Sequence, residues 1–124
     1  MAQHDARVLI VARAGPLTSG VHALLTTIPA VDSIAQADDA KAAVRALVGH
    51  RMAVVVLDAG LPDEQVQVVL RHIRAASPLT RCIVLADSVA QQQSSALAGA
   101  DAVLLKGVSA QDLYATIERL LLWP

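Results

Sequence analysis

Residues 54–63 read VVVLDAGLPD: four apolar residues, an aspartate and a loop that ends in Leu-Pro-Asp. An apolar run without alternation indicates a strand covered on both faces, as in a parallel sheet. The run extends back to residue 52, and four others resemble it: RVLIVA at 7–12, VDSIAQ at 31–36, CIVLAD at 82–87 and AVLLK at 102–106. We predict five strands, and the mixed polarity of VDSIAQ favours an edge strand.

Segments with the apolar spacing of amphipathic helices separate these runs. Each opens with a residue typical of a helix start: Pro16, Asp38, Asp63, Ser88 and Ser109. A strand–helix unit therefore repeats five times. This alternation predicts an α/β fold, with a parallel sheet between helices on both faces. We expect residues 1–124 to form a single domain, because a chain of this length suits one domain.

Composition excludes several functional classes. The formal net charge is −1 and the single cysteine cannot build a disulfide framework. Without a basic surface, direct binding to nucleic acid or to an anionic membrane is not expected. No apolar run is long enough to span a membrane and the first residues lack a signal peptide, so we expect a cytoplasmic protein. Phenylalanine is absent, so the core must be aliphatic.

In an open parallel sheet, functional groups lie beyond the carboxyl ends of the strands. Asp58 and Lys106 each end an apolar run. Each has an ordinary explanation: a carboxylate that caps the strand end, and a solvated lysine. Opposite charges at one sheet edge can also converge on one crevice. Asp38, Asp39 and Asp87 follow other strands and are further candidates at this edge.

Motifs of common enzymes are missing. Neither glycine pattern that binds phosphates, G-x-x-x-x-G-K-[ST] or G-x-G-x-x-G, is present. The histidines, His4, His22, His50 and His72, have no metal-ligand spacing with Cys82. The position of Cys82 inside a predicted strand favours a buried thiol over a nucleophile. We therefore expect no enzymatic turnover.

The combination of VVVLDAGLPD, TRCIVLADS and AGADAVLLKGVSAQDL resembles the receiver domain of bacterial response regulators, from Arg7 to about Leu122. The closest likeness is to receivers of the LuxR/NarL type, which carry a helix-turn-helix domain that would lie outside this chain. The resemblance implies a flavodoxin-like (βα)5 fold with strand order 2-1-3-4-5. It also implies that Asp58 takes the phosphoacceptor position and Lys106 the position that contacts the phosphoryl group.

Three departures from the family pattern are evident. The acidic pair that holds magnesium falls on Arg13–Ala14 or, with another gap, on Ala12–Arg13, and neither alignment supplies an acid. Ala86 replaces the hydroxyl residue after the fourth strand, and Val103 replaces the aromatic switch residue. Magnesium prefers carboxylate and phosphate oxygens. The resemblance therefore implies a degenerate site that has lost its Mg²⁺.

The charge of this site follows from the same positions. If Arg13 lies beside Asp58, these two residues and Lys106 sum to about +1, which repels a divalent cation. We expect Arg13 to contact Asp58, because adjacent strands lie about 4.8 Å apart. Alternatively, its long side chain leaves the crevice for solvent. A cationic crevice would also suit an anion such as sulfate.

Three functional hypotheses remain. The first is a pseudo-receiver that signals through protein contacts without Mg²⁺-dependent phosphorylation. The second is a working receiver that accepts phosphate on Asp58, for which a sensor kinase would be the partner. The third is a sensor of a small molecule or anion.

The C-terminal segment suggests an interface. Leu113, Ile117 and Leu120 share the side of a helix that should pack on the sheet. Off this side lie the interface candidates Tyr114, Leu121 and Trp123. We expect a homodimer or another protein contact through the fourth helix, fifth strand and fifth helix. The alternative is that this tail covers its own core or continues into a linker.

Overall fold

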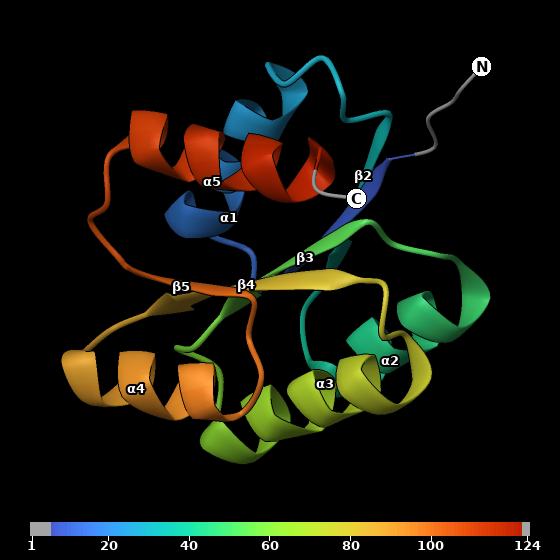
Figure 1. Cartoon of the computed structure of the whole chain (residues 1–124), viewed down its shortest axis with the longest axis vertical. Coiled ribbons are helices and arrows are strands. Elements are labelled where there is room, and N and C mark those ends of the chain that lie inside the picture. The colour runs from blue at the N-terminus through green and yellow to red at the C-terminus, as the bar shows by residue number, and fades with distance from the viewer. Residues whose placement is uncertain (1–5, 123–124) are drawn as a thin grey trace.

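The computed structural model describes residues 6–122, in which five strands alternate with five helices (Figure 1). The strands are β1 (Arg7–Val11), β2 (Ser33–Ala37), β3 (Val54–Asp58), β4 (Arg81–Ala86) and β5 (Ala102–Leu105). The helices are α1 (Pro16–Thr26), α2 (Ala40–Gly49), α3 (Asp63–Ala76), α4 (Val89–Leu97) and α5 (Ala110–Leu122).

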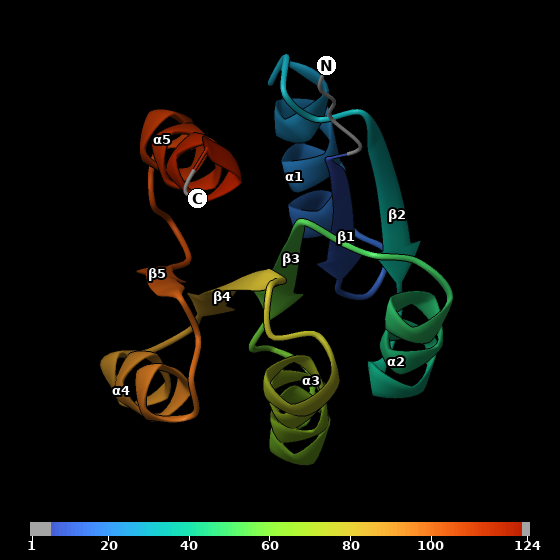
Figure 2. The same cartoon turned by 45° about the vertical axis from the view of Figure 1, so that its right-hand side comes forward.

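The strands form one parallel sheet in the order β2-β1-β3-β4-β5, which confirms the predicted fold. Helices α1 and α5 cover one face, and α2, α3 and α4 cover the other (Figures 1 and 2). Because all strands run the same way, their carboxyl ends meet at a single edge. Residues that follow different strands in the sequence are thereby brought together.

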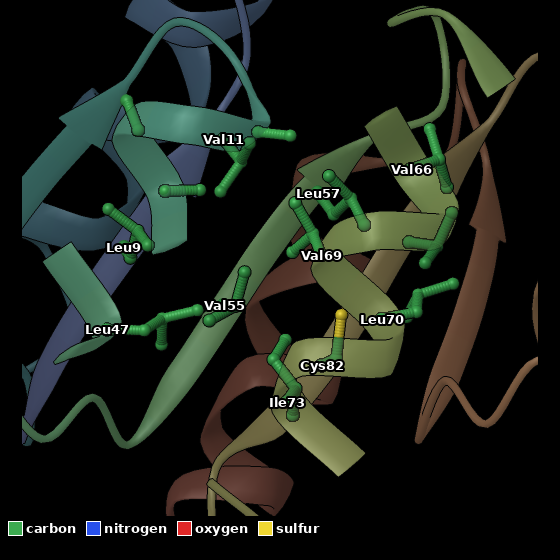
Figure 3. Packing of buried hydrophobic residues seen from close by; sticks show 14 of the residues in the cluster. Leu9, Val11, Leu47, Val55, Leu57, Val66, Val69, Leu70, Ile73 and Cys82 are labelled. Carbon is green, nitrogen blue, oxygen red and sulfur yellow. The ribbon is translucent and has the colours of Figure 1, made fainter. Parts of the chain in front are cut away.

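Aliphatic side chains fill both layers between sheet and helices. Strands β1, β3 and β4 are buried on both faces, whereas β2 at the edge is polar and partly exposed. On one face Leu47 of α2 and Ile73 of α3 pack toward Leu9 and Val55 (Figure 3). On the other face Leu25 and Ile117, among others, pack on the alternate residues of the same strands. Each such side chain contributes roughly 1.5–3 kcal/mol on burial.

The helix starts follow the sequence with two corrections. Asp39, not Asp38, caps α2, because its extended backbone lets its carboxylate accept a hydrogen bond from the Ala42 amide at 2.8 Å. Asp63 is the first residue of α3 and makes no cap hydrogen bond. Its charge stabilises the helix through the dipole instead. The caps predicted at Ser88 and Ser109 are confirmed, as is the place of Pro16 in the first turn of α1.

The limits of the strands differ from the predicted runs by one or two residues at their ends. Strand β2 covers residues 33–37 rather than 31–36, because the Val31 amide bonds to Ile28 in the preceding turn. Helix α2 ends at Gly49, and His50 is its C-cap. Among residues 6–122, none of the helices has both the length and the apolar character that crossing a membrane requires.

Asp101 fastens the amino end of β5 to β4. Its Oδ2 accepts hydrogen bonds from the backbone amide of Cys82 at 2.7 Å and from the Arg74 guanidinium at 2.9 Å. Its own amide donates to the Cys82 carbonyl at 2.9 Å. The turn before it needs Gly99, whose φ of 102° is unfavourable for residues with a side chain. The AGAD motif therefore sets the register of the last strand.

Burial makes Cys82 a test of the native core. Burial, and secondarily the charge of Asp101, raises the pKa of its thiol to about 12. Because only the thiolate reacts, we expect native protein to resist iodoacetamide at neutral pH and unfolded protein to be labelled. In a Leu97→Cys variant, whose new thiol replaces a side chain that is 90% exposed, one site should react under native conditions. Mass spectrometry counts the labels, and rapid native labelling of Cys82 would contradict this packing.

Candidate functional site

Three charged side chains meet at the carboxyl edge of the sheet. Asp58 is the last residue of β3, Asp87 follows β4, and Lys106 follows β5. Strand β4 pairs with both β3 and β5, with Leu85 opposite Asp58 and Ala86 opposite Leu105. Neighbouring parallel strands thus bring together residues separated by nearly fifty positions in the sequence.

The Lys106 ammonium contacts both carboxylates. Its Nζ lies 2.6 Å from Asp58 Oδ1 and 2.8 Å from Asp87 Oδ1. The side chain of Asp58 is 18% exposed and that of Lys106 28%, whereas Asp87 is 46% exposed at the rim. Two carboxylates so close would repel each other, and the shared cation compensates that repulsion.

The pKa of Lys106 reflects this arrangement. Partial burial acts to lower it, but hydrogen bonds to Asp58 and Asp87 and the charges of these carboxylates act in the other direction. The net result is a pKa above the ordinary value of 10.5. The ammonium form is therefore the one that the folded protein stabilises.

Gly60 leaves the space in which this ion pair forms. Its amide donates to Asp58 Oδ1 at 2.7 Å. A Cβ at position 60 would lie 2.9 Å from Lys106 Nζ and 3.0 Å from Asp58 Oδ1. Both distances are shorter than ordinary contacts, so a side chain here would push the lysine end away from the carboxylate.

Gln91 in α4 ties two loops of this edge together, and the sequence analysis missed it. Its Oε1 accepts from the Asp87 amide at 2.7 Å, and its Nε2 donates to the Ala59 carbonyl at 3.3 Å. The available signal was the spacing Ser88-x-x-Gln91, a capping box in which the glutamine reaches back over the helix start. Gln91 thereby holds the loop that carries Asp87 against the loop that follows Asp58.

The predicted ion pair between Arg13 and Asp58 is not present, so that prediction is wrong. Arg13 and Ala14 are both exposed, and within residues 6–122 Arg13 forms no ion pair with Asp58. The register of β1 and β3, with Val11 opposite Leu57, places the buried Ala12 beside Asp58 instead. The long side chain of Arg13, just past the strand end, is exposed to solvent, whereas the short side chain of Ala12 stays buried.

The predicted formal charge of about +1 for the crevice is therefore also wrong. It counted Arg13 and left out Asp87. The three groups in contact, Asp58, Asp87 and Lys106, carry a formal charge of −1. The prediction that a cationic crevice at this site would bind an anion such as sulfate therefore loses its basis.

Two other predicted positions lie close to this edge. Ala86 is buried, and its carbonyl accepts the Lys106 amide at 2.8 Å. Val103 in β5 is half-buried and packs against the aliphatic core on the side of α2 and α3. Neither carries a hydroxyl or an aromatic ring at the site.

The interface candidates are less exposed than expected. Tyr114 and Leu121 are half-buried and pack against the core under α1 and α5, and Trp123 lies outside the described residues. Over α4, β5 and α5, the large apolar residues that are exposed are Val89, Leu97, Leu105 and Leu122. The helical spacing identified the inner side of α5, but it could not tell how far the neighbouring helix covers the outer residues.

A family model of the response regulator receiver domain matches residues 8–118. The chain belongs to this family. It is thus a receiver domain of the two-component response regulators, as the resemblance implied. Among curated protein sequences, none matches this receiver domain.

Solved structures share the fold. The signal receiver domain of NarL from Mycobacterium tuberculosis matches with a TM-score of 0.84 and 22% identity, covering 98% of this chain and 100% of that one. A LuxR-family response regulator from Staphylococcus aureus gives 0.81 and 20%, covering 94% and 98%. The receiver domain of the sensor kinase PA1611 from Pseudomonas aeruginosa, solved with magnesium in its active-site cleft, gives 0.81 and 21%, covering 94% and 97%.

The raised pKa of Lys106 predicts how stability depends on pH. A cationic group with a raised folded pKa stabilises the protein fully below its unfolded pKa, and this contribution disappears as the pH rises through the folded pKa. We expect Lys106→Met to lower the free energy of unfolding by about 1 kcal/mol at neutral pH, the scale of a solvent-screened pair. Above pH 10.5 the difference from wild type should shrink.

Urea unfolding from neutral to alkaline pH provides the measurement. Lys41→Met is the matched control, because Lys41 is exposed and has no ion pair within residues 6–122. A Lys106→Met deficit no larger than that of the control would argue against a stabilising ion pair at this edge.

Proposed function

We propose that this chain is a pseudo-receiver, which signals through protein contacts rather than through Mg²⁺-dependent phosphorylation. The observation that carries the proposal is that the residue beside Asp58 at the end of β1 is the buried Ala12, followed by the exposed Arg13 and Ala14, none of which is acidic. The carboxylates that remain at this edge, Asp58 and Asp87, both contact the Lys106 ammonium.

The donor set at this edge does not fit magnesium. Mg²⁺ favours octahedral oxygen ligands and rests on carboxylates, but position 12, beside Asp58, is an alanine. Both remaining carboxylates point an oxygen at the same ammonium. Within residues 6–122, no three acidic, histidine or cysteine side chains are grouped to hold a metal.

The means of switching are also reduced. Charge neutralisation and positioning account for most of the catalysis of phosphoryl transfer. Ala86 has no hydroxyl to bind a phosphoryl oxygen, and Val103 has no ring to move between two positions. Gln91 meanwhile holds the β4–α4 loop to the β3–α3 loop. These features support one conformation instead of two that a modification could interconvert.

A working phosphoacceptor is the alternative, and the retained pair of Asp58 and Lys106 favours it. Asp58 is accessible enough to act as a nucleophile, and Lys106 would contact the new phosphoryl group. In that case a sensor kinase would be the phosphate source, and the metal ligands would have to differ from those of the family pattern.

Exposure to a small phosphodonor separates the two proposals. With phosphoramidate and magnesium at millimolar concentration, we expect the intact mass of wild type to remain unchanged, because no metal joins donor and carboxylate. A receiver with a full acidic pair serves as the positive control. A gain of one phosphoryl group that disappears in Asp58→Asn would establish the alternative and refute the pseudo-receiver.

We further propose that the contacts of this pseudo-receiver use the face formed by α4, β5 and α5. Its exposed apolar residues include Leu97 of α4, Leu105 of β5 and Leu122 of α5. Tyr114 and Leu121 would contact the partner through the parts of their side chains that the core leaves exposed. We include Trp123 in the same proposed interface. Exposed apolar surface of this kind is typical of protein interfaces.

Sedimentation tests a homodimer through this face. We expect wild type to dimerise in the high micromolar range and the double variant Leu97→Glu, Leu122→Glu to remain monomeric, because two charges would be buried. Val48→Glu, at an exposed valine on α2, is the control and should leave the dimer intact. A monomeric wild type excludes the homodimer, and an unaffected dimer in the double variant excludes this face.

A further inference from the structure

Helices α2 and α3 lie side by side on the face of the sheet opposite α1 and α5 (Figure 2). Side chains of both helices line an apolar groove. The groove consists of two adjoining hollows of about 660 Å³ and about 440 Å³, and Val48 lines both. Val44 and Val68 line the first hollow and Leu79 the second. Val48 is 75% exposed and Leu79 70%, so large apolar side chains here face solvent.

The groove is already formed in the free domain. The Ala40 amide at the start of α2 donates to Gln65 Oε1 of α3 at 3.0 Å, which fixes one end of the helix pair. Below the groove, Ala43 and Leu47 of α2 and Val69 of α3 belong to the same buried cluster. A partner would therefore meet a rigid surface and would not have to order it on binding.

Cations surround this apolar surface. Lys41 and Arg45 line the first hollow and Arg51 the second. Within residues 6–122, none of the three takes part in an ion pair. Asp39 is the acidic residue among the lining residues, and its carboxylate is engaged by the Ala42 amide. The groove thus combines an apolar floor with unneutralised positive charge, in a chain whose net charge is −1.

The shape of the groove favours a helix over a small molecule. Ligand pockets usually enclose most of the ligand surface, whereas Val48 and Leu79 in this groove stand open to solvent. An amphipathic helix instead lays its apolar stripe into such a groove, with anchors at i, i+3 or i+4, and i+7. The 10 residues of α2 span about 15 Å, which matches a partner segment of roughly three turns.

We propose that the α2–α3 groove binds an acidic amphipathic helix of a partner protein. The apolar stripe of that helix contacts Val44, Val48 and Val68, and its flanking glutamates or aspartates pair with Lys41 and Arg45. This surface lies on other helices than the α4–β5–α5 face, so it stands independently of the proposed function.

The probe is a synthetic helical peptide of about 14 residues, with leucines at i, i+4 and i+7 and glutamates on both sides of them. A control peptide has glutamine in place of every glutamate, which retains the apolar stripe and removes the charge. Each is titrated into the full ¹⁵N-labelled chain, and amide shifts locate the binding site. We expect the acidic peptide to shift α2 and α3 selectively, and the glutamine peptide to bind at least about tenfold more weakly.

Variants of the domain test the charges and the floor separately. Lys41→Glu with Arg45→Glu should raise the Kd at least about tenfold, because attraction becomes repulsion. Val48→Gln should weaken the binding of both peptides, because it removes part of the apolar floor of the groove. Arg119→Glu on α5, an exposed arginine on the opposite face, is the matched control and should not change the Kd. All substituted side chains are exposed, and the dispersion of the amide spectrum verifies that each variant is folded.

Three outcomes would overturn the proposal. The acidic peptide could fail to shift α2 and α3, or it could bind equally well after charge reversal. In the third outcome, the same amides would shift with protein concentration alone, which would assign the groove to a second copy of this chain.

Discussion

The ammonium of Lys106 allows two carboxylates to occupy one edge of the sheet, and the loops around that edge depend on it. Asp58 and Asp87 sit at the ends of neighbouring strands, and Asp58 also accepts a backbone hydrogen bond from the Gly60 amide. Without a shared cation, these two carboxylates would repel each other. The ion pairs therefore join the loops after β3, β4 and β5 into one unit, which Gln91 strengthens from α4.

This unit gives the receiver domain a site in which Lys106 offsets part of the negative charge of Asp58 and Asp87. A site built for regulation by phosphate keeps an excess of negative charge that a metal then balances. Here Lys106 offsets one of the two carboxylates, and the residue beside Asp58 is the small, buried Ala12. In the proposed pseudo-receiver, signalling would depend on the surfaces of the domain. Two surfaces of the domain, the α4–β5–α5 face and the α2–α3 groove, expose apolar side chains.

The sequence predicted the elements well because each depends on local pattern. Continuous β-branched runs gave the strands, and the more polar Ser33–Ala37 proved to be the edge. The order of the strands came from the family resemblance. Helix caps were harder to predict. Asp38 and Asp39 are both aspartates, and only the backbone angles decide which carboxylate accepts a hydrogen bond from a helix amide.

The candidate site was predicted in part. Asp58 and Lys106 were found because both end apolar runs, and alternation brings such ends together. The direction of a long side chain was not accessible in this way, and Arg13 turned out to be exposed while Asp87 reached the lysine. The contact of Gln91 depends on the distance between two loops, which a linear pattern does not contain.

The aliphatic interior has one more consequence. The chain has a single tyrosine, a single tryptophan and no phenylalanine, and Tyr114 lies at the margin of the packed layers. Ultraviolet absorbance and fluorescence therefore carry almost no information about the centre of this domain. Its interior is instead a dense array of valine, leucine and isoleucine methyl groups on both faces of the sheet. Methyl resonances are thus the natural reporters of any change that passes from one face to the other.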